Sequence, residues 1–302
     1  MITIERIAAV RARCDESRRA NDTVGLVPTM GFLHEGHRAL MRAARATNDL
    51  VVVSLFVNPT QFGPNEDLDA YPRDPEGDAR AASEEEVDVL FSPPVSEMYP
   101  TPGLTSVRVA EVTDGLCGAS RPHHFGGVAT VVTKLFSIVG PCTAYFGKKD
   151  FQQLVVVRRL VADLDLPVTV VGVPTVREID GVALSSRNAY LAPDERPAAT
   201  VLYRALQCAL KTVASGERDP ARVRHAALDL VGAEPLARLD YVEVVRADDL
   251  RAVDRLDDVV EHLVAVAVFI GGPRLIDNAT FTVSGSDVRA DLPGFDPTEQ
   301  ES

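Results

Sequence analysis

The feature that most constrains the fold is an alternation of short apolar runs with amphipathic segments over the first part of the chain. The apolar runs are rich in valine and leucine and cover residues 24–27, 50–57, 87–91, 143–146 and 168–173. Strands that are apolar throughout are buried on both faces, as they are in a parallel sheet covered by helices on each side. The alternation therefore predicts a doubly wound α/β domain whose ligands bind at the carboxyl ends of the strands.

Three segments between these runs have the spacing of helices. The repeat in residues 126–140 consists of Val128, Val131, Val132, Leu135, Phe136 and Val139. Positions three and four apart lie on one face of a helix, so this segment and residues 36–46 are predicted to be helical. Residues 151–166 are also predicted to form a helix, because Arg158 and Arg159 would interrupt a buried strand.

The character of the chain changes after residue 185. The later segments are two predicted helices, residues 194–215 and 219–233, and three predicted strands, residues 239–245, 262–270 and 279–283. Strands of this kind can pair antiparallel. The expected organisation is an α/β domain of residues 1–185, a smaller α+β domain of residues 186–284, and a disordered tail of residues 285–302, which is rich in Asp, Gly, Ser and Glu.

Composition and charge exclude several classes of protein. The chain has 302 residues, with 31 Lys and Arg against 44 Asp and Glu, and the net charge of −13 disfavours a broad surface for nucleic acids. The longest apolar runs have eight residues, too few to span a membrane, and Glu5 and Arg6 interrupt any N-terminal signal sequence. The four cysteines form no CxxC motif and fit neither a zinc site nor a disulfide framework. We therefore expect a cytoplasmic protein that binds neither nucleic acids nor membranes.

The segment "PTMGFLHEGH", residues 28–37, places two histidines where the first long apolar run gives way to a helix. A zinc site is disfavoured here, because catalytic zinc needs a third protein ligand and the HExxH motif spaces its histidines by four positions. His34 and His37 are three positions apart. Two ordinary histidines, buried or exposed, explain the pair equally well when it is considered alone.

A phosphate site has more physical support in this segment. A strand end, a glycine turn and a helix N-terminus provide backbone N–H groups and the positive end of a helix dipole. Histidines at this position can donate hydrogen bonds to phosphate oxygens. Gly36, which lacks a Cβ, would let a phosphate or a base approach the backbone. The segment therefore indicates a nucleotide site in a Rossmann-like domain.

Longer stretches of the sequence resemble one known family. "PTMGFLHEGH" is similar to the HxGH signature of the α/β nucleotidyltransferase superfamily, which includes class I aminoacyl-tRNA synthetases. Four further segments follow in the family's order: "VVVSLFVNPTQFGPNEDLDAYPRDP", "RPHHFGGVATVVTKLF", "YFGKKDFQQL" and "VPTVREIDGVALSSRNAYL". Together they resemble the pantoate–β-alanine ligase family over residues 23–191, and a weaker similarity resumes at "RLIDN", residues 274–278.

The resemblance implies a specific chemistry. ATP and pantoate would react to give pantoyl adenylate and pyrophosphate, and the amine of β-alanine would then displace AMP to form pantothenate, on the route to coenzyme A. ATP would be a substrate accompanied by Mg²⁺, the other ligands would be small molecules, and the protein would be a homodimer.

The family's motifs assign roles to individual residues of this chain. Catalysis is assigned to His34, His37, Lys149 and Arg187. ATP binding is assigned to Met30, Gly31, Phe32, Leu33, His34, Glu35, Gly36, His37, Gly147, Lys148, Lys149, Asp150, Val176, Leu184, Ser185, Ser186 and Arg187. Substrate binding is assigned to Gln61 for pantoate and β-alanine, to Gln153 for pantoate, and to Asn58, Tyr71, Arg121 and His124. Asp78 is a candidate for placing Mg²⁺.

Several of these residues also have a purely structural interpretation. Asp150 suits the N-cap of the following helix. Asn58 fits the chemistry of a tight turn. Arg121 and His124 fit a surface ion pair as well as a substrate contact, and residues 185–187 fit a polar turn between domains.

The sequence departs from the family's pattern at three positions. Lys148 stands where relatives usually have an acidic or neutral residue, which puts the local charge in question. Leu184 replaces a usual methionine, a change that conserves volume. Gly77 stands where some relatives have a second acid beside Asp78.

Two other functions compete with the ligase. Another HxGH nucleotidyltransferase, such as a nicotinamide mononucleotide adenylyltransferase, would need only the nucleotide motifs, so "FVNPTQFG" and "FGKKDFQQL" favour the ligase. A regulatory module that binds nucleotide without catalysis is disfavoured because His34, His37, Lys149 and Arg187 are all present.

Overall fold

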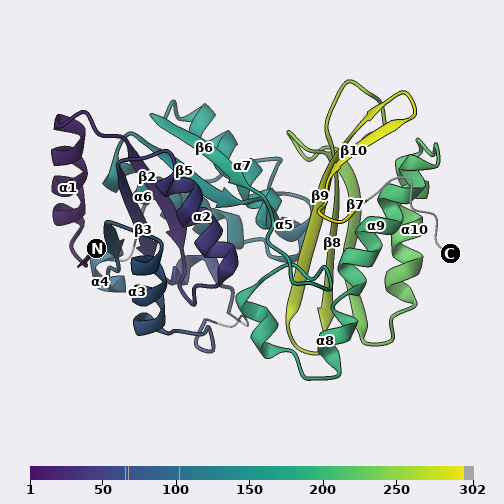
Figure 1. The fold of residues 1–302 in the computed structure, drawn as a ribbon, viewed down its shortest axis with the longest axis horizontal. Coiled ribbons are helices and arrows are strands. Elements are labelled where there is room, and N and C mark those ends of the chain that lie inside the picture. The colour runs from purple at the N-terminus through teal and green to yellow at the C-terminus, as the bar shows by residue number, and fades with distance from the viewer. Residues whose placement is uncertain (65, 67, 102, 296–302) are drawn as a thin grey trace. The chain divides into compact units, whose positions relative to one another are not determined.

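The computed structural model describes residues 1–64, 66, 68–101 and 103–295, which form two compact units (Figure 1). The first unit comprises Met1–Lys148 and Gln152–Val173, and the second comprises Lys149–Phe151 and Pro174–Ser302. The division after residue 173 differs from the expected domain boundary after residue 185. A buried ion pair described below is one of the contacts between the segment after residue 173 and the rest of the second unit.

The first unit is built on a six-stranded sheet in which all paired strands are parallel. Its strands are β1 (Ile2–Ile4), β2 (Val24–Thr29), β3 (Leu50–Leu55), β4 (Val89–Phe91), β5 (Cys142–Gly147) and β6 (Val168–Val173). The five strands predicted from the apolar runs are present, and β1 is an additional short edge strand. The predicted doubly wound α/β architecture is therefore confirmed.

The order of the strands, β1-β4-β3-β2-β5-β6, reverses its direction of growth beside β2. The chain adds β3 and β4 on one side of β2, and later adds β5 and β6 on the other. In such sheets ligands bind in the crevice at this reversal, beyond the carboxyl ends of the strands. The loops that begin at Met30 after β2 and at Lys148 after β5 occupy this position.

The helices of the first unit include the three that were predicted from the sequence. They are α1 (Ile7–Arg19), α2 (Glu35–Arg45), α3 (Pro75–Glu84), α4 (Val95–Met98), α5 (Cys117–Ser120), α6 (His124–Val139) and α7 (Phe151–Asp163), with the short turns η1 (Pro59–Gln61) and η2 (Lys148–Asp150). The three predicted helices correspond to α2, α6 and α7. The first residue of α7 and the last two of η2 belong to the second unit.

Packing fixes the position of α2 on the sheet. Leu40, Met41 and Ala44 of this helix join Val27 and Val53 in one buried apolar cluster. Burial of an aliphatic side chain such as Leu40 or Met41 stabilises the fold by about 1.5–3 kcal/mol. The first turn of α2 is thereby held immediately beyond the carboxyl end of β2.

The second unit combines helices with an antiparallel sheet. Its elements are η3 (Ser186–Tyr190), α8 (Glu195–Ala198), α9 (Val201–Ala214), α10 (Pro220–Gly232), β7 (Ala237–Arg246), β8 (His262–Ile270), β9 (Arg274–Ser284) and β10 (Asp287–Asp291). The strand order is β10-β9-β8-β7, and the helices and sheet share one apolar core. The predicted α+β character is confirmed, although the helix expected over residues 194–215 is divided into α8 and α9.

The tail predicted to be disordered from residue 285 contains β10. The chain reverses at Gly285, which has a φ of +60°, and β10 then pairs with β9 from Asp287 to Asp291. Residues 296–302 lie outside the described residues. In the part of the chain that is described, no helix has the length and apolar character needed to cross a membrane.

Candidate active site

The turn between β2 and α2 has an unusual backbone that is held from α3. Gly31 has a φ of +90° and Phe32 a φ of +52°, a left-handed conformation that is unfavourable for a residue with a bulky side chain. The carboxylate of Asp78 accepts hydrogen bonds from the N–H groups of Phe32 (3.0 Å) and Leu33 (2.6 Å). These two bonds offset the strain and set the path of the chain into α2.

Asp78 is buried, and its carboxylate forms hydrogen bonds with this turn. Burial raises the pKa of its carboxyl above the ordinary value, and the N–H donors of Leu33 and Phe32 offset only part of that rise. Both carboxylate oxygens accept backbone hydrogen bonds. Among the described residues, no three His, Cys, Asp or Glu side chains form a group that could hold a metal ion. The residues present therefore do not form a protein-only Mg²⁺ site around Asp78.

His34 and His37 cap the N-terminus of α2 reciprocally. The Nδ1 atom of His34 accepts a hydrogen bond from Gly36 N (3.1 Å), and Nδ1 of His37 accepts one from His34 N (3.2 Å). The ring centroids are 4.1 Å apart. Because each Nδ1 acts as an acceptor, the neutral form of each ring carries its proton on Nε2. The pair therefore presents two oriented N–H donors at a helix N-terminus.

Gly36 is required by His34 itself. A Cβ at this position would lie 2.9 Å from Cε1 and 3.0 Å from Nδ1 of the His34 ring. The ring covers the glycine, so the structure supplies a different reason for this residue from the expected close approach of a ligand to its backbone.

Charged side chains join α2 to the end of α3. Arg38 pairs with Glu84 (2.5 Å) and Glu85 (3.1 Å), and Arg42 Nε donates to Glu85 (2.9 Å). The hydrogen bond from Arg42 is the main cause that lowers the pKa of Glu85. Glu35, expected among the ATP-binding residues, directs its carboxylate to Arg42 (2.6 Å). These contacts support the orientation of the helix that carries the two histidines.

Asn58 forms the centre of a hydrogen-bond network after β3. Its side-chain carbonyl accepts from Thr60 Oγ1 (2.9 Å) and Tyr99 Oη (2.9 Å), and its amide donates to Gln61 Oε1 (3.1 Å) and Gly127 O (3.2 Å). The side chain is buried, and these four bonds use both amide hydrogens and both carbonyl lone pairs. The Asn58 side chain therefore holds the amide of Gln61 in place.

The structure brings four other predicted residues together around η1. Gln61 Nε2 lies 2.9 Å from Met30 Sδ, and Gln61 O contacts His124 Nδ1 (3.0 Å) and Arg121 Nη2 (3.4 Å). Arg121 also forms an ion pair with Glu66. Burial works to raise the pKa of Glu66, but the hydrogen bond and charge of Arg121 outweigh it and lower that pKa. Arg121 and His124 thus have structural contacts with the backbone of η1.

Tyr71 supports the same region by packing. Its buried ring lies edge-on against Phe62, with 6.0 Å between the ring centroids.

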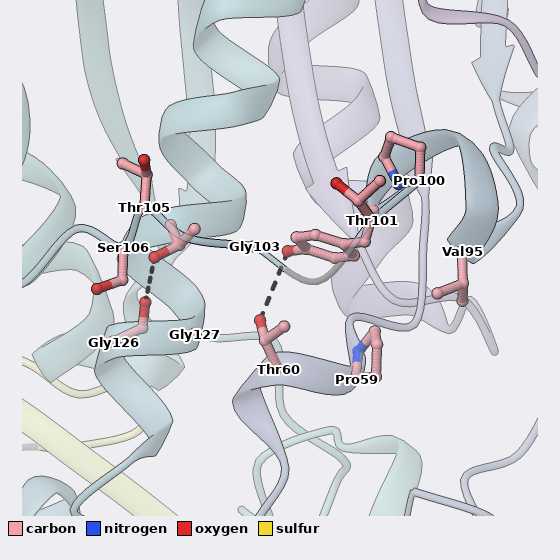
Figure 2. A pocket seen from close by; sticks show the side chains of 12 residues that line it. Pro59, Thr60, Val95, Pro100, Thr101, Gly103, Thr105, Ser106, Gly126 and Gly127 are labelled. Atoms are coloured by element: carbon pink, nitrogen blue, oxygen red, sulfur yellow. Dashed lines mark hydrogen bonds between the residues drawn. The ribbon is translucent and has the colours of Figure 1, made fainter.

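A cavity of about 510 Å³ is lined in part by Pro59 and Thr60 of η1 (Figure 2). Thr60, Tyr99, Gly126 and Thr130 are among its lining residues, whereas Gln61 does not line it. Thr60 and Tyr99 connect this cavity to Gln61 through Asn58, which accepts a hydrogen bond from each of them and donates one to Gln61 Oε1.

The end of β5 leads into the next predicted motif. A Cβ on Gly147 would meet no described atom within 4 Å, so open space lies beside this backbone. Gln153 is half-buried in the first turn of α7. Its neighbour Gln152 is buried, accepts from Cys117 N (2.9 Å) and donates to two carbonyl oxygens of the preceding loop. The two glutamines therefore have different roles, of which Gln152 has the structural one.

The second unit contains the remaining predicted nucleotide residues. Val176 O accepts a hydrogen bond from Leu184 N (3.0 Å) across a hairpin that turns at Gly181, which has a φ of +89°. Ser185 follows this hairpin, and its Oγ accepts from Arg187 N (3.3 Å), while Ser186 is buried. The hairpin thus delivers the Ser185–Arg187 segment in a capped, ordered turn.

Lys149 and Asp150 lie in η2. Lys149 Nζ is 3.8 Å from Asp150 Oδ2, and the Lys149 side chain is 18% exposed. Lys149, Asp150 and the residues 176–187 all belong to the second unit, whereas His34, His37 and Gln61 belong to the first. Each set is ordered within its own unit.

The contacts of some residues that shape these loops could not be predicted from the sequence. These residues are Met30 as a partner of Gln61, Gln152, Arg177, Asp277 and Asn278. The last two belong to the "RLIDN" segment, whose weak similarity to the family was the only indication of a role.

Comparisons with known proteins identify relatives over nearly the whole chain. A family model described as pantoate-beta-alanine ligase matches residues 2–280. A pantothenate synthetase of Pelotomaculum thermopropionicum is 53% identical over 279 residues, covering 92% of this chain and 98% of that protein. Another, from Heliobacterium modesticaldum, is 55% identical over 283 residues, covering 94% and 100%.

Solved structures agree with this result. The crystal structure of pantothenate synthetase from Thermus thermophilus matches with a TM-score of 0.86 and 48% identity, covering 92% of this chain and 98% of that one. The pantoate-beta-alanine ligase of Francisella tularensis, complexed with beta-gamma ATP and beta-alanine, matches with a TM-score of 0.74 and 33% identity, covering 92% and 97%.

Proposed function

Because the chain belongs to the pantoate–β-alanine ligase family, we propose that His37, Lys149 and Arg187 stabilise the phosphates of ATP during its reaction. The activity of the family is the ATP-dependent condensation of pantoate with β-alanine to pantothenate, and this chain is an enzyme of that kind. The observation that carries the proposed roles is the reciprocal capping of α2 by His34 and His37, beyond β2 at the reversal of the sheet.

In the first step the pantoate carboxylate attacks the α-phosphorus of ATP. A new P–O bond forms, the bond to the pyrophosphate oxygen breaks, and pantoyl adenylate results. Negative charge accumulates on the phosphate oxygens, where fixed hydrogen-bond donors are most effective. The Nε2–H of His37 is such a donor, because its ring is fixed through Nδ1. Lys149 and Arg187 supply full positive charges for the same phosphates.

In the second step the amine of β-alanine attacks the carbonyl carbon of the mixed anhydride. A C–N bond forms, AMP leaves with the electron pair of the broken C–O bond, and the amine loses a proton. We propose that Gln61 positions both pantoate and β-alanine and that Gln153 contacts pantoate. Support comes from the Asn58 network, which fixes the Gln61 amide without using all of its hydrogen-bonding capacity.

The same arrangement leads us to expect selectivity for short amines. The nucleophile must approach the anhydride carbon within about 3–3.5 Å. An added methylene, as in γ-aminobutyrate, displaces the amine from that position, so turnover should fall sharply relative to β-alanine. Equal turnover of the two amines would contradict a restrictive site around Gln61.

We further propose that Mg²⁺ enters with ATP and is held by its phosphate oxygens. This form of binding is consistent with the engagement of both Asp78 oxygens by the backbone.

The protein is proposed to be a cytoplasmic homodimer with the first unit supplying the contact, and light scattering at micromolar concentration tests the assembly.

The proposed roles are tested by separating the two steps. Exchange of pyrophosphate into ATP in the presence of pantoate, without β-alanine, measures adenylation alone. His37→Ala and Lys149→Ala should each lower this exchange about 10²–10³-fold, the usual effect of removing one donor to a developing charge. Amide formation from supplied pantoyl adenylate should change much less, because AMP is already a good leaving group.

His225→Ala provides the control, since His225 is an exposed histidine on α10 and should leave both steps unchanged. If His37→Ala preserved exchange and abolished the second step, His37 would not act on the phosphates.

A further inference from the structure

We infer that Asp277 and Asn278, neighbours on β9, are positioning residues that fix the two phosphate-binding loops of the second unit. The inference rests on the proposed roles of Lys149 and Arg187. It gives a function to the "RLIDN" segment, in which Asp277 lies 100 residues from Arg177 and Asn278 lies 129 residues from Lys149 in sequence.

Asn278 holds the backbone of Lys149. Its buried side chain donates from Nδ2 to Lys149 O at 2.7 Å. Lys149–Phe151 belongs to the second compact unit although the residues on both sides of it belong to the first. The hydrogen bond from Asn278 is a direct contact between this segment and β9 of the second unit. The bond fixes the main chain of Lys149 and leaves its ammonium group able to follow the phosphates during the reaction.

Asp277 holds the second loop through a paired interaction. Its two oxygens accept from Arg177 Nη1 (2.6 Å) and Nη2 (2.9 Å), and the two side chains are 2% and 6% exposed. Arg177 Nη1 also donates to Gly181 O (2.9 Å), and Arg177 pairs with Ala183 across the hairpin. A bidentate, buried pair of this kind fixes orientation as well as distance. The chain that follows Ala183 leads directly into Ser185 and Arg187.

The two residues act from one short piece of strand. Successive side chains of a strand point to opposite faces, so adjacent positions can reach two different loops. The backbone of Asp277 and Asn278 is itself paired with β8, at Val266 and Ala265. The sheet therefore sets the position of the Lys149 loop relative to the hairpin that carries Arg187, within the same unit.

The test uses the full chain and measures pantoate-dependent pyrophosphate exchange. Asn278→Ala removes the neutral hydrogen bond to Lys149 O and keeps the buried ion pair, so the fold should persist. We expect exchange to fall about 10–100-fold, the effect of a small misplacement of a catalytic group, with no comparable change in amide formation from pantoyl adenylate. Thr282→Ala, at an exposed position of the same strand, should change neither rate.

A double-mutant cycle separates positioning from a general structural effect. In the Lys149→Ala background, Asn278→Ala should lower exchange by less than about twofold, because the group that it positions is gone. Asp277→Asn should behave in the same way in the Arg187→Ala background. The inference would be overturned if Asn278→Ala lowered exchange equally in the wild type and in the Lys149→Ala background. It would also be overturned if Asn278→Ala alone left exchange normal.

The cycle also distinguishes this inference from the proposed function. If Lys149→Ala alone left exchange unchanged, the proposed role of Lys149 would fail. If Lys149→Ala lowered exchange and Asn278→Ala did not, the role of Lys149 would stand and the positioning role of Asn278 would fail.

Discussion

At the scale of single residues, the site depends on a backbone conformation that is unfavourable for the residue that adopts it. Phe32 adopts a positive φ, and the carboxylate of Asp78, 46 positions away, accepts hydrogen bonds from the N–H groups of Phe32 and Leu33. The strain is thus maintained by a partner on another helix. Such positions cluster where a loop must be held ready for a ligand.

Replacing Asp78 should therefore affect both stability and the first step of the reaction. Asp78→Ala leaves two backbone N–H groups without their acceptor, and the free energy of unfolding should fall by about 2 kcal/mol or more. Pyrophosphate exchange should fall with it, because the turn that leads into His34 relaxes. Chemical denaturation and the exchange assay measure the two effects.

The matched control is Glu76→Ala, at an exposed acidic position in the first turn of the same helix. It should leave stability within about 0.5 kcal/mol of the wild type. Unchanged exchange in a folded Asp78→Ala protein would show that the turn does not depend on this carboxylate.

At the scale of elements, the position of η1 depends on a close approach of α6. A Cβ at Gly127 would come within 2.3 Å of Thr60 O and 2.6 Å of Gln61 Cα, whereas a Cβ at Gly126 would meet nothing within 4 Å. Figure 2 shows both glycines at the cavity beside Thr60. The helix can approach η1 only because residue 127 has no side chain.

This pair of glycines gives a prediction with a built-in control. Gly127→Ala must displace backbone atoms of η1, so it should destabilise the protein by about 1–3 kcal/mol, as overpacking does. It should also raise the KM for pantoate and β-alanine, since Gln61 moves with η1. Gly126→Ala should be neutral or stabilise the helix by up to about 1 kcal/mol. Thermal unfolding and steady-state kinetics of the two variants compare these outcomes, and similar effects at both positions would refute this account.

The elements that could be predicted from the sequence are those in which the spacing of apolar residues matches the spacing of buried positions. The stripe from Val128 to Val139 predicted α6 because every third or fourth residue contacts the core. β10 could not be predicted, since only Val288 on that strand is fully buried and its pairing depends on β9. The short edge strand β1 could not be predicted for a similar reason, as two of its three residues are exposed.

The motifs of the candidate site could be recognised in the sequence, but the tertiary contacts that hold them could not be predicted. The pattern of residues 28–37 indicated a phosphate site, while the tertiary partners that hold it lie far away in sequence. The hydrogen bonds of Asn58 to Tyr99 and Gly127 could not be predicted, because they depend on the folded arrangement. Gln152 and Gln153 are chemically identical, and only their phase on α7 distinguishes them.

At the scale of the whole molecule, the chain is acidic, and several of its carboxylates have a lowered pKa in the folded state. Glu66, Glu85 and Asp180 are examples, with nearby arginines that favour the charged form. A group of this kind contributes stability above its unfolded pKa, and the contribution is lost as the pH falls through its folded pKa. Asp78, whose pKa is raised, works in the opposite direction, since its contribution is lost as the pH rises. The carboxylates with a lowered pKa outnumber those with a raised pKa among the examples above. The free energy of unfolding should therefore be nearly constant from neutral pH to about 5 and decline in more acidic solution.

Glu66 allows this expectation to be tested through one ion pair. Its ordinary pKa is 4.5 and its folded value is lower, so the ion pair with Arg121 stabilises the protein fully above about pH 5 and is lost below the folded value. Glu66→Gln should therefore melt below the wild type at pH 7, with a difference that narrows as the pH falls below 4.5. Because Arg121 also contacts Gln61 O, the variant should raise the KM for β-alanine at pH 7. Circular dichroism melting curves of wild type, Glu66→Gln and the exposed Glu76→Gln between pH 3 and 7 measure the effect. A melting difference that stayed constant across this range would mean that the charge of Glu66 is not what stabilises this part of the site.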